Sequence, residues 1–200
     1  MSPFGDMEVI MKNVIIAGAG ALGTHVALFL RNHAQLKMID FDRVERKNVL
    51  SQFHGKASVG KNKAQAMQQT MKFLFGIKVD AVPHRITEDN VDVLLQDADL
   101  VIDCLDNAKS RKLIQDFVRD AGIACVHGAL AADGAFGQVI WDEDFVIDTE
   151  PGDGAATCED GEHLPFINIV SANLAKSAQE FLQNEKKMGF QINPAGTIRA

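Results

Sequence analysis

The sequence predicts an α/β fold: a Rossmann-like, doubly wound and mostly parallel sheet with an appended β-hairpin and a C-terminal helix. Two patterns carry this prediction. Short apolar runs alternate with helical segments over the first 128 residues, and a glycine-rich turn over 18–23 joins the first apolar run to the first helix. The 200 residues suffice for one domain with a full core. We divide it into a Rossmann-like core over 12–128 and a second part over 129–200.

The core part alternates strands and helices. In chain order we expect a strand over 14–17, a helix over 22–30, a strand over 36–39, a polar stretch over 42–58, a helix over 61–73, a strand over 77–82, a helix over 87–95, a strand over 100–104, a helix over 108–121 and a strand over 123–126. The strand over 100–104 starts as a continuous apolar run, which is typical of a strand buried on both faces.

The pattern changes in the second part. Short strands over 138–141 and 145–147, with Asp-Glu-Asp between them, predict the hairpin. Residues 149–163 are rich in Gly, Asp and Glu, and we expect an acidic loop there. Pro165 suits the first turn of a helix that reaches about Asn184, and the tail over 189–200 is expected to add a strand.

Composition excludes several classes of protein. The net charge of −7 argues against a general nucleic-acid binder, whose surface would be basic. No apolar run approaches the roughly 20 residues of a membrane helix, and the N-terminus lacks the pattern of a signal peptide. Three cysteines in 200 residues favour a reducing compartment, so we expect a cytoplasmic protein.

The glycine turn predicts a nucleotide site. Gly18 permits the tight turn, Gly20 lets the backbone approach a phosphate, and Gly23 lets the helix pack closely on the strand. Asp40, at the end of the second strand, is placed to accept hydrogen bonds from ribose hydroxyls. These residues alone do not distinguish NAD from ATP.

Other polar residues favour ATP. Asp106 follows the strand over 100–104, and a carboxylate beside phosphates can hold Mg²⁺. Lys63 can contact phosphates as a point charge. Asn48 and Gln52 can line the nucleotide site, and Asp42 repeats the carboxylate two positions after Asp40. An NAD-dependent oxidoreductase is disfavoured, because the chain has no Tyr and no Ser-Tyr-Lys set.

On these motifs the chain resembles the ThiF/MoeB family, bacterial relatives of ubiquitin-activating enzymes. The resemblance covers about residues 12–185. The matching segments are Gly18 to Gly23; Asp40 to Asp42 with Val44, Glu45, Asn48 and Gln52; Val59 to Lys63; Val101 to Asn107 with Arg111; and His127 to Ala129 through Gly137 and Gln138.

The resemblance implies an adenylyltransferase that uses ATP and Mg²⁺ to activate a carboxylate and releases pyrophosphate. The usual substrate is the C-terminal Gly-Gly of a small ubiquitin-like sulfur-carrier protein, and a small-molecule carboxylate is the alternative. In this scheme Asp106 carries Mg²⁺, Asp40 contacts the ribose and Lys63 contacts the phosphates. Arg111 supports the Asp106 loop by pairing with a carboxylate.

The chain departs from the family pattern at three places. Only about a dozen residues precede the first strand, too few for the helical segment with arginines that family members carry. Ser51 stands where the pattern has Arg, and Arg46, Lys47 or Lys56 are candidates to compensate. The zinc-binding Cys-x-x-Cys pairs are absent, so we expect no zinc. These departures keep open a second class, a non-catalytic partner of an activating enzyme.

Two further residues or surfaces are candidates for function. Cys158 lies in the acidic loop and is a candidate acyl acceptor, although its acidic neighbours disfavour the thiolate. The helix from Pro165 carries the small residues Ser171, Ala172 and Ala175, which predict a homodimer through that helix.

Overall fold

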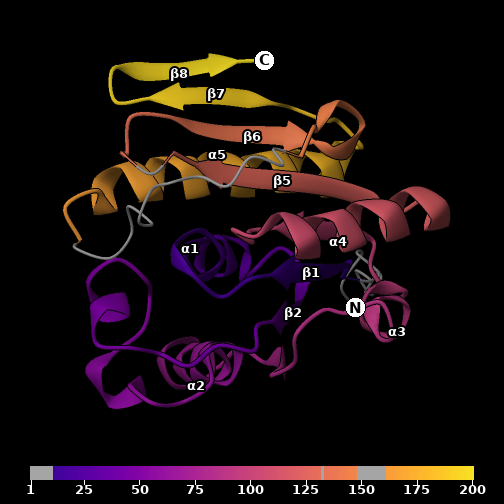
Figure 1. Cartoon of the computed structure of the whole chain (residues 1–200). Coiled ribbons are helices and arrows are strands. Elements are labelled where there is room, and N and C mark those ends of the chain that lie inside the picture. The colour runs from indigo at the N-terminus through magenta and orange to yellow at the C-terminus, as the bar shows by residue number, and fades with distance from the viewer. Residues whose placement is uncertain (1–10, 132, 148–160) are drawn as a thin grey trace, which may run out of the picture.

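The computed structural model describes residues 11–131, 133–147 and 161–200, and in these ranges all strands join one mixed sheet (Figure 1). The strand order is β3-β2-β1-β4-β5-β6-β7-β8. The strands are β1 (Asn13–Ala17), β2 (Gln35–Ile39), β3 (Val79–Val82), β4 (Leu100–Asp103), β5 (Ala124–Leu130), β6 (Gly137–Trp141), β7 (Phe190–Asn193) and β8 (Gly196–Arg199). All pairings among β1 to β5 are parallel. The pairs β5–β6, β6–β7 and β7–β8 are antiparallel, so the sheet is mostly parallel with antiparallel strands added at one edge, which confirms the predicted fold class.

Helices cover both faces of the parallel part. The α-helices are α1 (Ala21–Leu30), α2 (Lys63–Phe75), α3 (Val91–Leu95), α4 (Ala108–Ala121) and α5 (Leu164–Asn184). Short 3-10 helices occur at η1 (Lys47–Leu50), η2 (Lys56–Ser58) and η3 (Asp142–Asp144). None of these described helices is long and apolar enough to cross a membrane.

The core consists of two apolar layers separated by the sheet. Side chains alternate across a strand, so Val14 and Ile16 of β1 pack with residues of α1, α2 and α5, whereas Ile15 packs with α3 and α4. In Figure 1, α5 lies along β5 and β6 and also packs on α1. This sandwich places the carboxyl ends of β1, β2 and β4 side by side, which is the edge that carries ligands in open parallel sheets.

The predicted hairpin over 138–147 is wrong. Residues 138–141 do form a strand, but 142–144 form η3 and 145–147 are not a strand. The reason lies in Asp142, whose side chain turns into the protein and binds Arg119 and Gln115 of α4. The appended hairpin is instead β7–β8, in the tail where a single strand was expected.

Two helix starts also differ from the prediction. Helix α3 begins at Val91 instead of residue 87, because the Asn90 side chain accepts a hydrogen bond from the backbone N–H of Thr87 and holds 87–90 in a turn. Helix α2 begins at Lys63, because Asn62 caps it by accepting from the N–H of Gln65.

The small residues of α5 are used inside the chain. Ser171 and Ala175 are buried, and the Ser171 hydroxyl lies 3.5 Å from the carbonyl oxygen of Leu22 in α1. Small residues allow close helix approach, and here the close neighbour is α1. Ser171 and Ala175 are therefore not available for the predicted dimer contact, and only Ala172 of the three is exposed; the homodimer itself stays a prediction.

Candidate functional site

In the glycine turn between β1 and α1, two of the three glycines stand where any side chain would clash. Gly18 has a φ of +99°, and a Cβ there would lie 2.9 Å from the carbonyl oxygen of Cys104. A Cβ on Gly23 would lie 1.9 Å from the carbonyl oxygen of Gly18. Gly20 differs, because a Cβ would meet no atom within 4 Å. The turn therefore packs tightly at both ends and has open space at its middle, where α1 begins.

Asp40, directly after β2, lies against this turn. It is 9% exposed, and its two carboxylate oxygens accept from the backbone N–H of Ala19 at 2.7 Å and of Asp42 at 2.8 Å. Burial raises the pKa of Asp40, an effect that these hydrogen bonds and the charge of Lys63 oppose. The carboxylate thus organises the glycine turn.

Lys63 lies at the first position of α2, next to the Asp40–Asp42 segment. Its side chain is 12% exposed, and Nζ is 3.4 Å from a carboxylate oxygen of Asp42. Asn62 fixes this arrangement by donating to the carbonyl oxygens of Asp40 at 2.7 Å and Asp42 at 3.1 Å. The structure therefore brings together Lys63, Asp42, Asp40 and the glycine turn.

Asn48 and Gln52 differ in their surroundings. The Asn48 side-chain oxygen accepts from the N–H of Glu45 at 2.8 Å, so it stabilises its own turn. Gln52 is buried, and its Oε1 has no hydrogen-bond partner in the described structure. Ser51, which stands where the family pattern has Arg, is buried at 1% exposure. Asn48 thus has a structural task, while Gln52 retains an unused polar atom.

His54 belongs to the same segment, and the sequence analysis did not single it out. Its Nε2 is 3.0 Å from the carbonyl oxygen of Ala19 in the glycine turn, and its Nδ1 is buried without a partner in the described part of the chain. Burial lowers the pKa of His54, and the charges of Lys63 and His25 lower it further, so the ring is neutral and Nε2 donates. Orphaned buried polar atoms are uncommon, and here two of them belong to the segment that packs on the predicted phosphate loop.

The loop after β4 carries Asp106. This residue is exposed and lies between two fixed points. On one side, the N–H of Leu105 donates to Asp103 at 2.9 Å. On the other, Asn107 caps α4 by accepting from the N–H of Ser110 at 2.9 Å. Because Gly18 packs directly against Cys104, this loop lies beside the glycine turn.

Arg111 supports the same loop, and the carboxylate pairing that the resemblance implied is present. Its Nε lies 3.4 Å from Asp103 and donates to the carbonyl oxygen of Leu105 at 2.7 Å. Its Nη2 also donates to Gly128 on β5 at 2.9 Å. The Asp106 loop is therefore held by β4, β5 and α4 together.

A buried ionic cluster lies behind the loop. His127 on β5 has Nδ1 2.8 Å from Asp103 and Nε2 3.1 Å from Asp142, and the ring and Asp103 have no exposed side-chain surface. Arg119 pairs with the other oxygen of Asp142 at 2.6 Å. In the sequence, His127 stands out only as part of a motif, and Asp142 only as part of the Asp-Glu-Asp of the predicted hairpin. No local pattern indicates this cluster, because its members come together from three separate segments.

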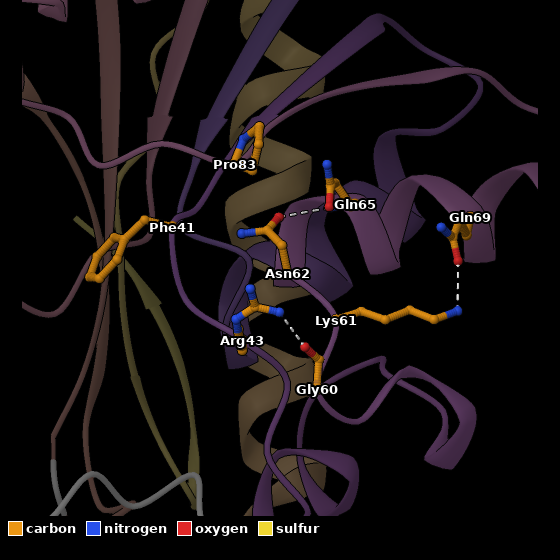
Figure 2. A pocket seen from close by; sticks show the side chains of 8 residues that line it. All are labelled: Phe41, Arg43, Gly60, Lys61, Asn62, Gln65, Gln69 and Pro83. Atoms are coloured by element: carbon orange, nitrogen blue, oxygen red, sulfur yellow. Dashed lines mark hydrogen bonds between the residues drawn. The ribbon is translucent and has the colours of Figure 1, made fainter.

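A cavity of about 450 Å³ borders the Asp40–Asp42 segment and Asn62 (Figure 2). It is lined by Phe41, Arg43, Gly60, Lys61, Asn62, Gln65, Gln69 and Pro83. None of the predicted nucleotide residues lines it. Figure 2 shows Arg43 bound to the Gly60 carbonyl oxygen and Lys61 bound to Gln69. The candidate site is the strand-end edge of the sheet together with the glycine turn. Cys158 lies outside the described residues.

Comparison with known proteins agrees with this geometry. The family model described as "ThiF family" matches residues 8–193. The chain belongs to the ThiF family. It is 32% identical over 134 residues to the SAMP-activating enzyme E1 of Haloferax volcanii, covering 65% of this chain and 50% of that protein. It is 31% identical over 186 residues to the probable adenylyltransferase/sulfurtransferase MoeZ of Mycobacterium tuberculosis, covering 85% and 47%.

Solved structures show the same fold. Escherichia coli MccB with ATP has a TM-score of 0.74 at 16% identity, with 94% of this chain and 62% of that chain covered. PaaA has a TM-score of 0.73 at 18% identity, with 94% and 63% covered. The chain spans about half the length of the curated relatives it matches, 50% of the first and 46% of MOCS3 from Dictyostelium discoideum. Several of the relatives are named adenylyltransferases, and they extend beyond the matched part.

Proposed function

We propose that this chain is an ATP-dependent adenylyltransferase that converts a carboxylate to an acyl-adenylate. The observation that carries the proposal is the position of Asp106, exposed on a loop that is braced beside the glycine turn. An exposed carboxylate beside a phosphate loop suits Mg²⁺·ATP and opposes a dinucleotide without a cation.

We assign the phosphates and the ribose of ATP to residues at the strand-end edge as follows. Open space at Gly20 accommodates phosphates at the start of α1. Asp40 accepts from the ribose, and Lys63, now paired with Asp42, turns to the phosphates. The unpartnered atom of Gln52 belongs to a carboxamide, whose NH₂ and oxygen exchange places by a flip, so it can donate to an anion. Asn48 remains a proposed lining residue beside its structural role.

Mg²⁺ would be held by Asp106 and would neutralise charge on the phosphate oxygens. Within the described residues no group of three or more His, Cys, Asp or Glu side chains is arranged to hold a metal ion, so phosphate oxygens and water would complete its coordination.

The reaction needs alignment more than acid–base chemistry. An oxygen of the substrate carboxylate attacks the α-phosphorus of ATP, the bond from that phosphorus to pyrophosphate breaks, and acyl-adenylate and pyrophosphate form. The attacking carboxylate is already ionised at neutral pH, so no general base is required. The chain supplies orientation through its turn and charge neutralisation through Lys63.

The proposed substrate is the C-terminal Gly-Gly of a ubiquitin-like sulfur-carrier protein. The relative named "Sulfur carrier protein adenylyltransferase", from Thermus thermophilus, is 31% identical over 134 residues and supports this substrate class. A small-molecule carboxylate is the alternative within the same chemistry. We further propose a cytoplasmic homodimer. In it the Cys158 sulfur attacks the acyl carbon of the adenylate, so that a thioester forms and AMP leaves.

A second candidate function is a non-catalytic partner of an activating enzyme. Buried Ser51 favours it, because the family pattern places a phosphate-binding Arg there. The two functions differ in whether the isolated chain turns over ATP.

ATP–pyrophosphate exchange tests the proposal. We expect exchange with a carrier protein ending in Gly-Gly and loss of exchange and of Mg²⁺·ATP binding in Asp106→Asn. The matched control is Asp97→Asn, an exposed aspartate before the opposite end of β4, which should retain both. Binding of ATP without exchange for any carrier or small carboxylate would favour the non-catalytic partner, and tight NADH binding without ATP binding would contradict both.

A further inference from the structure

The cluster of Asp103, His127 and Asp142 connects the Asp106 loop to the interior of the protein. Asp103 and His127 are register partners on the parallel strands β4 and β5, so their side chains leave the same face at the same height. The ring of His127 spans the gap from Asp103, at 2.8 Å, to Asp142, at 3.1 Å. The link therefore crosses from β4 through β5 to the turn after β6.

The chemistry of the three groups defines how they bind. An ionised carboxylate only accepts hydrogen bonds. Nδ1 faces an oxygen of Asp103, and Nε2 faces one of Asp142 with the Cys125 sulfur 3.6 Å away, so the two carboxylate contacts are satisfied when both nitrogens carry hydrogen and donate. Although burial opposes it, the hydrogen bonds from Arg119 and two further side chains lower the pKa of Asp142, which keeps this carboxylate ionised.

The ring is also fixed in orientation. Phe145 stacks on His127 with ring centroids 3.9 Å apart and an interplanar angle of 16°. Gln115 donates to the same oxygen of Asp142 that faces the ring, at 3.1 Å. Packing and hydrogen bonds thus leave the ring one position, between the two carboxylates.

From Asp103 the link reaches the proposed metal ligand. One oxygen of Asp103 receives His127 and Arg111, and the other receives the N–H of Leu105 at 2.9 Å. Leu105 immediately precedes Asp106, and its carbonyl oxygen is held by Arg111. If Asp103 rotates, the backbone before Asp106 loses its hydrogen bond.

We infer that His127 is a positioning residue for Mg²⁺·ATP: by donating from both ring nitrogens it fixes Asp103, and Asp103 fixes the loop that presents Asp106. The inference rests on the proposed function, because it assigns Mg²⁺ to Asp106. A purely structural His127 would affect stability alone. Groups that orient a metal ligand indirectly affect metal affinity by roughly 10- to 100-fold.

The test compares nucleotide binding with and without Mg²⁺. His127→Phe keeps the flat ring against Phe145 and removes both donors. We expect Mg²⁺·ATP to bind about tenfold more weakly to this variant, while ATP measured in EDTA binds as it does to the wild type, since the glycine turn and Asp40 are unchanged. The matched control is Ile114→Ala, a fully buried position on α4, which lowers stability and leaves the Mg²⁺ dependence unchanged.

A measurement on the wild type covers the case in which His127→Phe does not fold. Imidazole ¹⁵N–¹H correlation spectra should show hydrogen on both ring nitrogens of His127. Hydrogen on one nitrogen only would overturn the inference, as would equal weakening of Mg²⁺·ATP and metal-free ATP in His127→Phe. A wild-type chain that binds no Mg²⁺·ATP would instead contradict the proposed function, whatever the spectrum shows.

Discussion

The carboxyl ends of β2 and β4 each bury an aspartate, and the two aspartates are stabilised in different ways. Asp40, after β2, is held by the backbone N–H groups of Ala19 and Asp42. Asp103, at the end of β4, contacts two side chains, His127 and Arg111, in addition to one backbone N–H. Backbone N–H groups hold the aspartate after β2, whereas mainly side-chain donors hold the aspartate at the end of β4.

The difference teaches how one sheet edge supports two tasks. At β2 a single carboxylate organises the glycine turn and is also the proposed ribose ligand. At β4 the tasks are divided: Asp103 is buried and organises the loop, while Asp106, three residues later, is exposed and free to bind. A group that must bind a metal benefits from this division, because its own lone pairs are not used to hold the backbone.

The largest effect is expected at the β2 end, where the donors to Asp40 depend on the tight glycine turn. Gly23→Ala places a Cβ 1.9 Å from the Gly18 carbonyl oxygen, so the turn must open. We expect a loss of more than about 4 kcal/mol in the free energy of unfolding, measured in urea.

Gly20→Ala is the control for this prediction. Its Cβ would meet nothing within 4 Å, so the unfolding free energy should change by less than about 1 kcal/mol. Equal losses in the two variants would show that the turn is not held by close packing at Gly23.

The next effect separates the two aspartates. Asp103→Ala leaves His127 and Arg111 facing a vacant site in the interior, and removing one partner of a buried ion pair costs about 3 kcal/mol. Asp40→Ala leaves only backbone N–H groups unpaired, at about 2 kcal/mol. Urea unfolding of both variants at pH 7 measures the difference. A larger loss for Asp40→Ala would reverse the comparison.

A pH-dependent effect is expected at Asp142. Hydrogen bonds lower the pKa of Asp142 against the opposing effect of burial, so the ionised group stabilises the fold above its unfolded pKa, and this is lost as pH falls through the folded pKa. Asp142→Asn should be less stable than the wild type by about 2 kcal/mol at pH 7. The difference should hold down to the unfolded pKa of 3.8 and narrow as the pH falls further through the folded pKa, measured by unfolding from pH 7 downward.

Asp40 provides the contrast for that titration. Burial raises the pKa of Asp40, so its ionisation opposes folding as pH rises through the folded pKa.

A stability difference between Asp142→Asn and the wild type that stays constant over the whole pH range would contradict an ionised Asp142 in the cluster.

The smallest effect on stability is expected at Asp106. Its side chain is exposed, and the backbone around it is held by Asp103 and Arg111. Asp106→Asn should change the unfolding free energy by less than about 0.5 kcal/mol while abolishing Mg²⁺·ATP binding. Calorimetry of unfolding and of binding on one preparation checks both. A large loss of stability would mean that Asp106 also organises the loop.

Sequence reasoning worked best where the pattern is local. The glycine turn, the position of Asp40 and the alternation of strands and helices along the first part of the chain follow from short segments with known backbone requirements. It failed over 142–147, where Asp-Glu-Asp suggested a hairpin turn and Asp142 instead binds groups on α4 and β5. It also missed His54, whose contact with Ala19 joins segments 35 positions apart.

The sequence by itself therefore determined the fold class, the family and the position of the glycine turn, because periodicity, glycines and strand-end carboxylates act within a few residues. The tertiary structure decided which carboxylates organise and which are free. Asp103 and Asp106 look alike in the sequence, yet one is enclosed by His127 and Arg111 and the other is exposed. Burial and the partner at the far end of a hydrogen bond are set by strands and helices distant in the chain, so only the packed molecule reveals them.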